Sequence, residues 1–223
     1  MRMIAEFEKT GRMSWFSHLD LQSTMQRALR RAKLPVRYSQ GYNPHVNLSF
    51  ATALSVGLNS VCEILDVEME EEVAPEIFVE KLNPALPEGL KCHKAALIDD
   101  KVPAMMALMK EAEYTIKVKG IDLTEKVNAM LKADEVLAEK HTKTTTKTVN
   151  IRPLIHDLIC SFDGETSTLV AVLENTNANI LKVDLLMQTL CADTPFSSVR
   201  TGFYAEGKNG RIPLFDAGAG TLK

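Results

Sequence analysis

The chain has 223 residues, of which 45% are hydrophobic and 25% are charged, and its formal net charge is −3. This composition is typical of a folded globular protein and argues against a disordered chain. The length suits two domains of roughly 100 residues each. No apolar run approaches the roughly 20 residues that cross a bilayer, and the first residues show no signal-peptide pattern, so we expect a cytoplasmic protein.

The first half of the chain predicts the order β, α, β, β, α, β. Residues 3–9 alternate as a half-buried strand, with Ile4 on its polar side. Ser17 and Asp20 have the spacing of a capping box, which predicts that a helix starts there and runs to about Lys33, before Pro35. The other predicted elements are a strand at 36–38 that resumes after a turn at 46–50, strands at 61–69 and 91–97, and a helix at 75–82.

The second half repeats this order without clear residue identity. Its predicted elements are strands at 113–119, 151–155, 168–173 and 199–204, helices at 122–132 and 180–190, and a polar extended stretch through Thr148. Repeated βαββαβ patterns predict an α+β protein of two tandem ferredoxin-like halves, each an antiparallel sheet with helices on one face. The expected boundaries are 1–98 and 111–215 for the halves, 99–110 for a linker, and 216–223 for a loose tail.

Charge is segregated along the first half. No acidic residue occurs from Leu21 to Cys62, whereas acids crowd the segment that follows. The residues of this basic segment that suit a polyanion are Arg27, Arg30, Arg31, Arg37, Tyr38, Tyr42 and Asn43. Guanidinium groups bind phosphate oxygens, the tyrosine rings can stack on bases, and the amide can reach a base edge, so this segment predicts an RNA-binding site. The alternative is a solvated helix face followed by a turn.

Three further side chains in this region are candidate site residues. Glu63 shares a strand face with apolar residues, so we expect it to be buried beside a cation, either as a structural ion pair with His18 or an arginine or as a site residue. His18 and His45 are candidate acid and base residues for RNA cleavage, with ordinary structural histidines as the alternative. They lack a third ligand at recognisable spacing, so we expect no metal site.

Catalytic and cofactor motifs are missing from the sequence. It has no phosphate-binding loop, no dinucleotide-binding glycine pattern and no iron–sulfur motif, so we expect no cofactor and no activity of the chain by itself. The four cysteines are widely spaced and are expected to be buried free thiols: Cys62, Cys92, Cys160 and Cys191.

Several segments resemble one bacterial family. They are Phe16–Asp20, Arg27–Ala32, Tyr38–His45, Leu48–Phe50 and Asn150–Ile155. They are similar to the radical-SAM-linked proteins, a domain family of unknown function found fused to or encoded beside radical SAM proteins, often near genes for ribosomal proteins and a ribonuclease. The resemblance implies two partners, an RNA and a separate radical SAM protein, and a role in RNA or ribosome-linked modification.

Two other functions stay open. One is a protein-docking module that binds an acidic partner through the basic face. The other is a metal-independent endoribonuclease, because the fold expected here resembles the CRISPR repeat-processing enzymes, whose glycine-rich loop is echoed by Gly202, Gly207 and Gly210 with Lys208 and Arg211. A likeness of fold transfers no activity.

Overall fold

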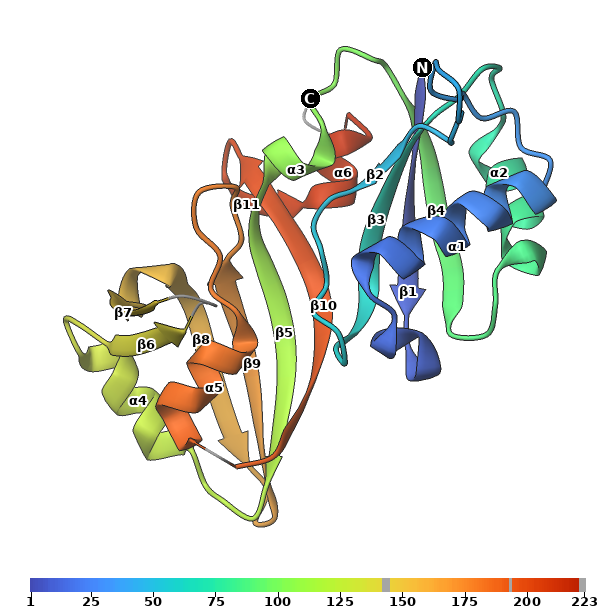
Figure 1. The fold of residues 1–223 in the computed structure, drawn as a ribbon. Helices are drawn as coiled ribbons and strands as arrows, with labels where there is room; N and C mark the ends of the chain where they lie inside the picture. Colours follow the sequence, from blue (N-terminus) through green and yellow to red (C-terminus); the bar gives the residue numbers. More distant parts are fainter. Residues whose placement is uncertain (142–144, 193, 221–223) are drawn as a thin grey trace. The chain divides into compact units, whose positions relative to one another are not determined.

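The computed structural model describes residues 1–141, 145–192 and 194–220 (Figure 1). It confirms a mixed α+β protein built on mostly antiparallel sheet. The chain divides into two compact units, the first made of Met1–Met109 with Phe203–Lys223 and the second of Lys110–Gly202. Within the described ranges, no helix is both long and apolar enough to cross a membrane.

The strands and α-helices of the first unit begin in the predicted order β, α, β, β, α, β. Its elements are β1 (Arg2–Lys9), η1 (Gly11–Trp15), α1 (His18–Arg31), β2 (Leu48–Phe50), β3 (Asn59–Glu68), α2 (Pro75–Leu82), η2 (Asn83–Ala85), β4 (Leu90–Ile98), α3 (Met105–Leu108), β11 (Gly210–Pro213) and α6 (Leu214–Gly218). Strand β1 pairs with β4 and β3, and β2 pairs with β3, all antiparallel. Helices α1 and α2 share one hydrophobic core with this sheet.

Helix α1 begins where the capping box predicts. The hydroxyl of Ser17 accepts a hydrogen bond from the backbone amide of Asp20, and the Asp20 carboxylate accepts one from the backbone amide of Ser17. The face that carries Leu21, Met25 and Leu29 is buried in the core, as the periodicity indicates.

The predicted strand at 36–38 is wrong as a separate element. Val36 and Tyr38 form only isolated bridges, to Met69 and Val46. The segment is too short to build a ladder before the turn at 41–44, so it stays an extended connection between α1 and β2.

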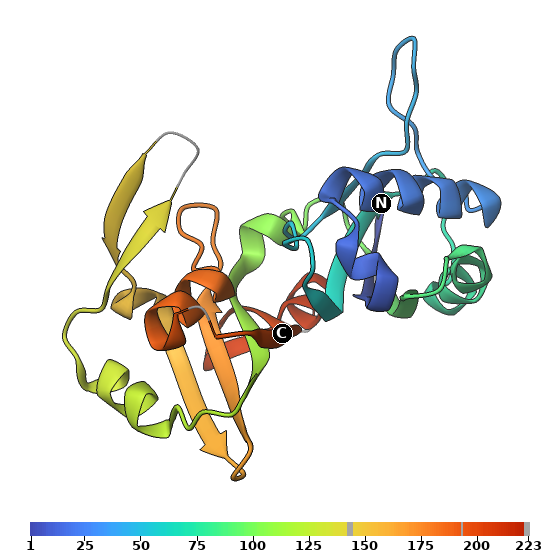
Figure 2. The same cartoon turned by 60° about the horizontal axis from the view of Figure 1, so that its bottom comes forward.

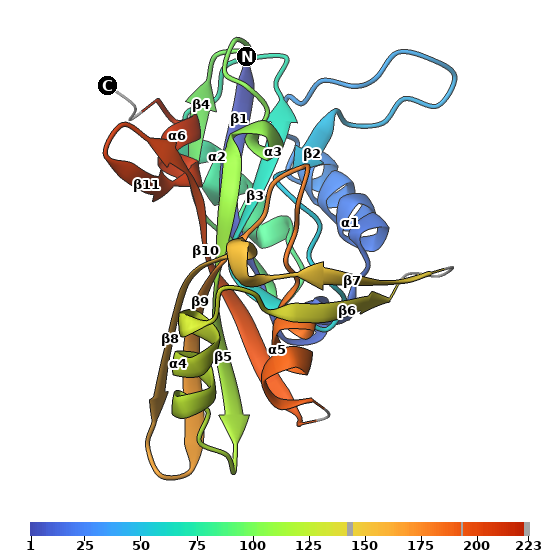
Figure 3. The same cartoon turned by 90° about the vertical axis from the view of Figure 1, so that its left-hand side faces the viewer.

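The second unit has the elements β5 (Met109–Lys119), α4 (Thr124–Lys132), β6 (Leu137–His141), β7 (Thr146–Asn150), η3 (Arg152–Leu154), β8 (Ile155–Phe162), β9 (Thr166–Glu174), α5 (Val183–Cys191) and β10, which spans Phe196–Gly207 and so crosses into the first unit. Its strands lie in the order β10, β5, β9, β8. The polar stretch that we expected to be merely extended forms a separate antiparallel hairpin of β6 and β7, which Figure 3 shows clearly.

The strand predicted at 151–155 lies later, at β8. Asn150 Oδ1 accepts hydrogen bonds from the backbone amides of Val136 and Arg152, and Pro153 has no amide to donate to a ladder. The chain therefore turns through η3 before the strand begins at Ile155.

The predicted loose tail, 216–223, is wrong for its first residues. Residues 214–218 form α6, and the side chains of Leu214 and Phe215 are buried. A Cβ built on Gly218 would lie 2.7 Å from Met105 Sδ and 3.0 Å from Ile4 Cδ1, so α6 packs closely on β1 and α3. This contact buries Ile4, which we expected on the polar side of its strand. Residues 221–223 lie outside the described ranges.

Candidate nucleic-acid interface

A braced loop, defined here as residues 39–45, connects α1 to β2 and projects from the first unit (Figure 2). The amide of Ser39 donates to the carbonyl of His45 at 2.8 Å, and the amide of His45 donates to Ser39 Oγ at 3.1 Å. The ring of His45 adds a hydrogen bond between Nδ1 and Ser39 Oγ at 3.0 Å. Tyr42 and Asn43, at the tip of the loop, are exposed, and the Tyr42 side chain is fully so.

The four arginines of the predicted site differ in how they are held. Arg27 and Arg30 are exposed on α1, where their only hydrogen bonds within the described residues go to Thr24 Oγ1 and to the Gln26 carbonyl of their own helix. Arg31 instead donates to the carbonyl of Ala85 at 2.6 Å, which ties the end of α1 to η2. Two of the arginines therefore present guanidinium groups to solvent.

Arg37 lies beside an acidic residue in the fold, although the segment of sequence that carries it contains none. Its Nη1 lies 3.6 Å from Glu68 Oε2, and Asn47 Nδ2 donates to the same oxygen. Glu68 stands on β3, which runs beside the segment that carries Arg37. The prediction of four equivalent phosphate ligands is therefore weakened at Arg37. Tyr38, by contrast with Tyr42, is half-buried against the core, which limits its stacking face.

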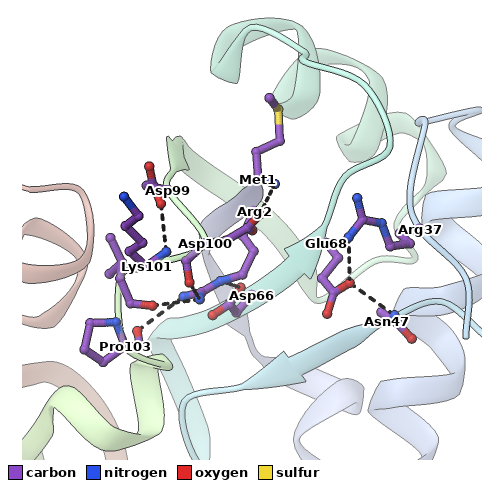
Figure 4. A network of polar contacts seen from close by, with 11 residues as sticks. Met1, Arg2, Arg37, Asn47, Asp66, Glu68, Asp99, Asp100, Lys101 and Pro103 are labelled. Carbon is purple, nitrogen blue, oxygen red and sulfur yellow. Dashed lines mark hydrogen bonds and ion pairs between the residues drawn. The ribbon is translucent and has the colours of Figure 1, made fainter.

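A polar pocket of about 440 Å³ adjoins the base of the braced loop. The residues that line it are Arg2, Gln22, His45, Val46, Asn47, Leu48, Ser49, Asp66, Glu68 and Ala104. Because Gln22 and His45 line it together, the braced loop and the first half of α1 meet at this pocket. Figure 4 shows the acidic part of its wall, where Asp66 and Glu68 lie between two arginines.

Arg2 organises the wall of this pocket. Its Nε donates to Asp66 Oδ1 at 3.0 Å, and its Nη1 donates to the carbonyl of Val102 at 2.7 Å. Its Nη2 donates to the carbonyl of Pro103 at 3.2 Å. Asp66 is 6% exposed, and this burial raises the pKa of its carboxyl group, while the charge and the hydrogen bond of Arg2 act in the opposite direction. Sequence patterns did not indicate Arg2 or Asp66, because they meet only through the pairing of β1 and β3.

The two candidate histidines lie in different surroundings. His18 is exposed at the first position of α1, and its ring meets that of Phe50 edge-on at 5.5 Å between centroids. His45 is held by the braced loop and lines the pocket, which His18 does not. No hydrogen bond among the described residues joins the two rings, and of the two only His45 lines the pocket.

Glu63 is buried, as the strand register predicts, with 1% of its surface exposed. Lys9 is also 1% exposed and lies on the neighbouring strand, two residues after Phe7, which is directly opposite Glu63. The Lys9 ammonium donates to the carbonyls of Ser14 and Phe16, so the start of α1 converges on the same region.

The thiols and the glycine-rich segment are also placed by the structure. All four cysteines are free, and three are buried, whereas Cys160 is half-buried on β8. Burial raises the pKa of the Cys92 thiol to about 12. Gly207 and Gly210 close the tight hairpin of β10 and β11, and the Arg211 guanidinium lies 5.7 Å from the centre of the Tyr204 ring. This segment forms a structural turn.

These features define an α+β protein with a basic, loop-bearing surface and a polar pocket. A family model described as an uncharacterized protein conserved in bacteria (DUF2344) matches residues 2–182. The chain belongs to this bacterial family. No curated protein matches it.

Two solved structures are similar in fold. A crystal structure of a Cbf5-Nop10-Gar1 complex matches with a TM-score of 0.49 and 8% identity, over 90% of this chain and 48% of that one. A crystal structure of the archaeal box H/ACA sRNP Nop10-Cbf5 complex matches with a TM-score of 0.43 and 10% identity, over 89% of this chain and 46% of that one. The chain thus spans about half the length of these proteins.

Proposed function

We propose that this protein is a cytoplasmic RNA-binding accessory protein that acts with a separate radical SAM enzyme in RNA or ribosome-linked modification. The observation that carries the RNA-binding part is the fully exposed ring of Tyr42 on the braced loop. An exposed aromatic ring on a hydrogen-bonded loop offers a stacking face to an unpaired base. Arg27 and Arg30 on α1 can bind the phosphates, because their guanidinium groups face solvent.

The partner enzyme is supported by the resemblance of the basic segment to the radical-SAM-linked proteins and by an exposed apolar patch. The patch consists of Trp15 and Leu19, each 71% exposed, and Val56, 55% exposed. Val56 lies near Trp15, because the next residue, Gly57, lies against the Trp15 ring, and Leu19 follows four residues after Trp15 in the first turn of α1. Exposed tryptophan is enriched in protein interfaces, so this patch favours docking of a protein.

We also propose that the two units are tandem ferredoxin-like halves. In the first unit the order β4, β1, β3, β2 supports this, and in the second the order β10, β5, β9, β8 does. Both place the fourth and third strands on either side of the first. The β6–β7 hairpin is then an insertion in the second half.

RNA binding is tested by changing Arg27 and Arg30 to alanine together. If each contacts one phosphate, the double variant should bind single-stranded RNA more weakly and lose about 1.4 from the slope of log affinity against log salt, at about 0.7 for each contact. Filter binding at several salt concentrations measures both quantities. A double variant of Lys126 and Lys132 on α4 removes the same charge from the second unit and should keep the wild-type slope.

An unchanged affinity and slope in the α1 variant would place the RNA site elsewhere. The same samples test the endoribonuclease alternative, provided that they contain a chelator. Because His45 lines the pocket and His18 does not, we expect the RNA to remain intact. Cleavage of the RNA at discrete positions that disappears in His18→Ala or His45→Ala would instead show that the protein is an endoribonuclease.

Docking of a protein partner is tested by Trp15→Ser. Removing the exposed ring should leave stability near the wild-type value and reduce recovery of a radical SAM protein when the tagged chain is purified from its native cells. Leu137→Ser, at an exposed apolar position of β6, is the matched control. If Trp15→Ser and wild type recover equal amounts of the enzyme, the patch does not bind this partner.

A further inference from the structure

The Asp66 carboxylate has an oxygen left to bind a ligand. Arg2 uses Nε for Asp66 Oδ1 and both of its terminal nitrogens for the carbonyls of Val102 and Pro103. Within the described part of the chain, no other group forms a hydrogen bond to this carboxylate. Asp66 Oδ2 accepts no hydrogen bond from the described residues and is not fully enclosed by the protein, so a ligand in the pocket can reach it.

The charges of the pocket select against a free ion. Asp66 is balanced by Arg2, and Glu68 lies beside Arg37. Neither a phosphate nor an ammonium ion would therefore meet an excess of opposite charge. A neutral ligand that donates hydrogen bonds fits better, because it can satisfy the carboxylate without adding an uncompensated charge.

The rest of the lining suits a flat polar ring. The side chains of Gln22, Asn47 and Ser49 add amide and hydroxyl groups, while Val46 and Leu48 add apolar surface. Ser49 is directly opposite Asp66 in the pairing of β2 with β3. Polar groups that converge beside some apolar surface can fix the orientation of a small ligand, and about 440 Å³ lies within the usual volume of small-ligand sites.

We propose that this pocket takes one unpaired RNA base that carries an exocyclic amino group, namely guanine, cytosine or adenine. This inference rests on the proposed RNA binding, and it specifies which bases the pocket would recognise. The amino group would donate to Asp66 Oδ2, as carboxylates accept from base amino groups elsewhere. Uracil has no amino group, and its one donor on its pairing edge, N3–H, lies between two carbonyl oxygens that the carboxylates repel. His45 joins the pocket to the braced loop, so a base next to one stacked on Tyr42 could enter it.

Binding of the four nucleosides to the full chain tests the pocket without any phosphate. Chemical-shift titration should show guanosine, cytidine and adenosine binding about tenfold more tightly than uridine, with shifts at the amides of Asn47 and Ser49. Asp66→Asn should weaken the three by about 10- to 100-fold and remove the preference over uridine, because the charged acceptor is lost. Ser49→Phe changes an exposed residue at the pocket and leaves the Arg2–Asp66 contact intact, so it should block binding in a protein of wild-type stability.

The Arg27 and Arg30 double variant separates this inference from the proposed function. It should lose RNA affinity and keep nucleoside binding. The proposed base site would be wrong if all four nucleosides bound equally, if none bound, or if Asp66→Asn and Ser49→Phe both bound them as wild type does. Each of these results would leave the proposed RNA binding unaffected. Nucleoside binding in a chain that binds no RNA would overturn the proposed function instead. Displacement of the nucleosides by spermidine at lower concentration would show a cation site and overturn the base assignment.

Discussion

Glu63 is a carboxylate buried inside an otherwise apolar stretch of β3. It stands directly opposite Phe7 on β1, and Lys9, the buried cation of that strand, is two residues further along. The pairing rule that a buried charge needs an opposite charge led us to expect His18 or an arginine. Lys9 is a further candidate for that place, because β1 and β3 are neighbours in the sheet although their residues are far apart in the chain.

At this residue scale we predict that Glu63→Gln lowers the free energy of unfolding by about 3 to 5 kcal/mol. The change keeps the shape of the side chain but leaves Lys9 charged and buried. Urea denaturation measures the effect. Glu68→Gln is the matched control, since its ion pair with Arg37 is partly exposed and should contribute less than about 1 kcal/mol. A Glu63→Gln midpoint equal to that of wild type would show that the carboxylate is not needed to balance Lys9.

Helix α1 and the braced loop that follows it together make up the candidate interface. The helix is held at its start by Ser17 and Asp20 and at its end by the bond from Arg31 to Ala85. The loop is held at its base by Ser39 and His45. Two fixed elements can present Arg27, Arg30 and Tyr42 with little loss of entropy on binding, which is the benefit of preorganisation.

For the helix we predict that Ser17→Ala costs about 1 kcal/mol, because an orphan amide at the N-terminus loses its acceptor. The hydrogen bonds from Ser17 lower the pKa of Asp20 below 3.8. A lowered folded-state pKa stabilises the protein above that value and loses the contribution as the pH falls through it. The difference between wild type and variant should therefore shrink below about pH 4. Ser23→Ala, at an exposed mid-helix position, should cost nothing at any pH.

Over the whole molecule, the C-terminal segment decides how the core of the first unit is completed. Residues 203–220 belong with the first unit although they follow the second in the chain. Helix α6 covers Ile4 of β1, and Phe215 is buried under the ammonium of Lys94 at 4.3 Å from its ring centre. The first unit is therefore incomplete without the last residues of the described chain.

We predict that Phe215→Ala destabilises the first unit by about 3 to 5 kcal/mol, because it leaves a cavity beneath α6. Hydrogen exchange of the β1 amides measures this, and exchange at Ile4 should accelerate most. Phe162→Ala removes a ring that is 37% exposed on β8 of the second unit, so it should have a smaller effect that spares β1. Unchanged protection of β1 in Phe215→Ala would mean that α6 adds little to the core.

Local features of the sequence by themselves determined much of this protein. Hydrophobic periodicity and capping residues located α1, α2 and β5, and alternation along β3 placed Glu63 in the core, because these signals depend on neighbours within a few residues. The basic segment, with Arg27, Arg30 and Tyr42, was visible for the same reason.

Tertiary structure alone decided the contacts between distant segments. It paired Arg37 with Glu68, joined Arg2 to Asp66 in the wall of a pocket, and turned the glycine-rich tail into α6 over Ile4. These contacts depend on which strands are neighbours in a sheet and on which face a later helix covers. No local periodicity carries that information, because the interaction energies arise between residues brought together only by the completed fold.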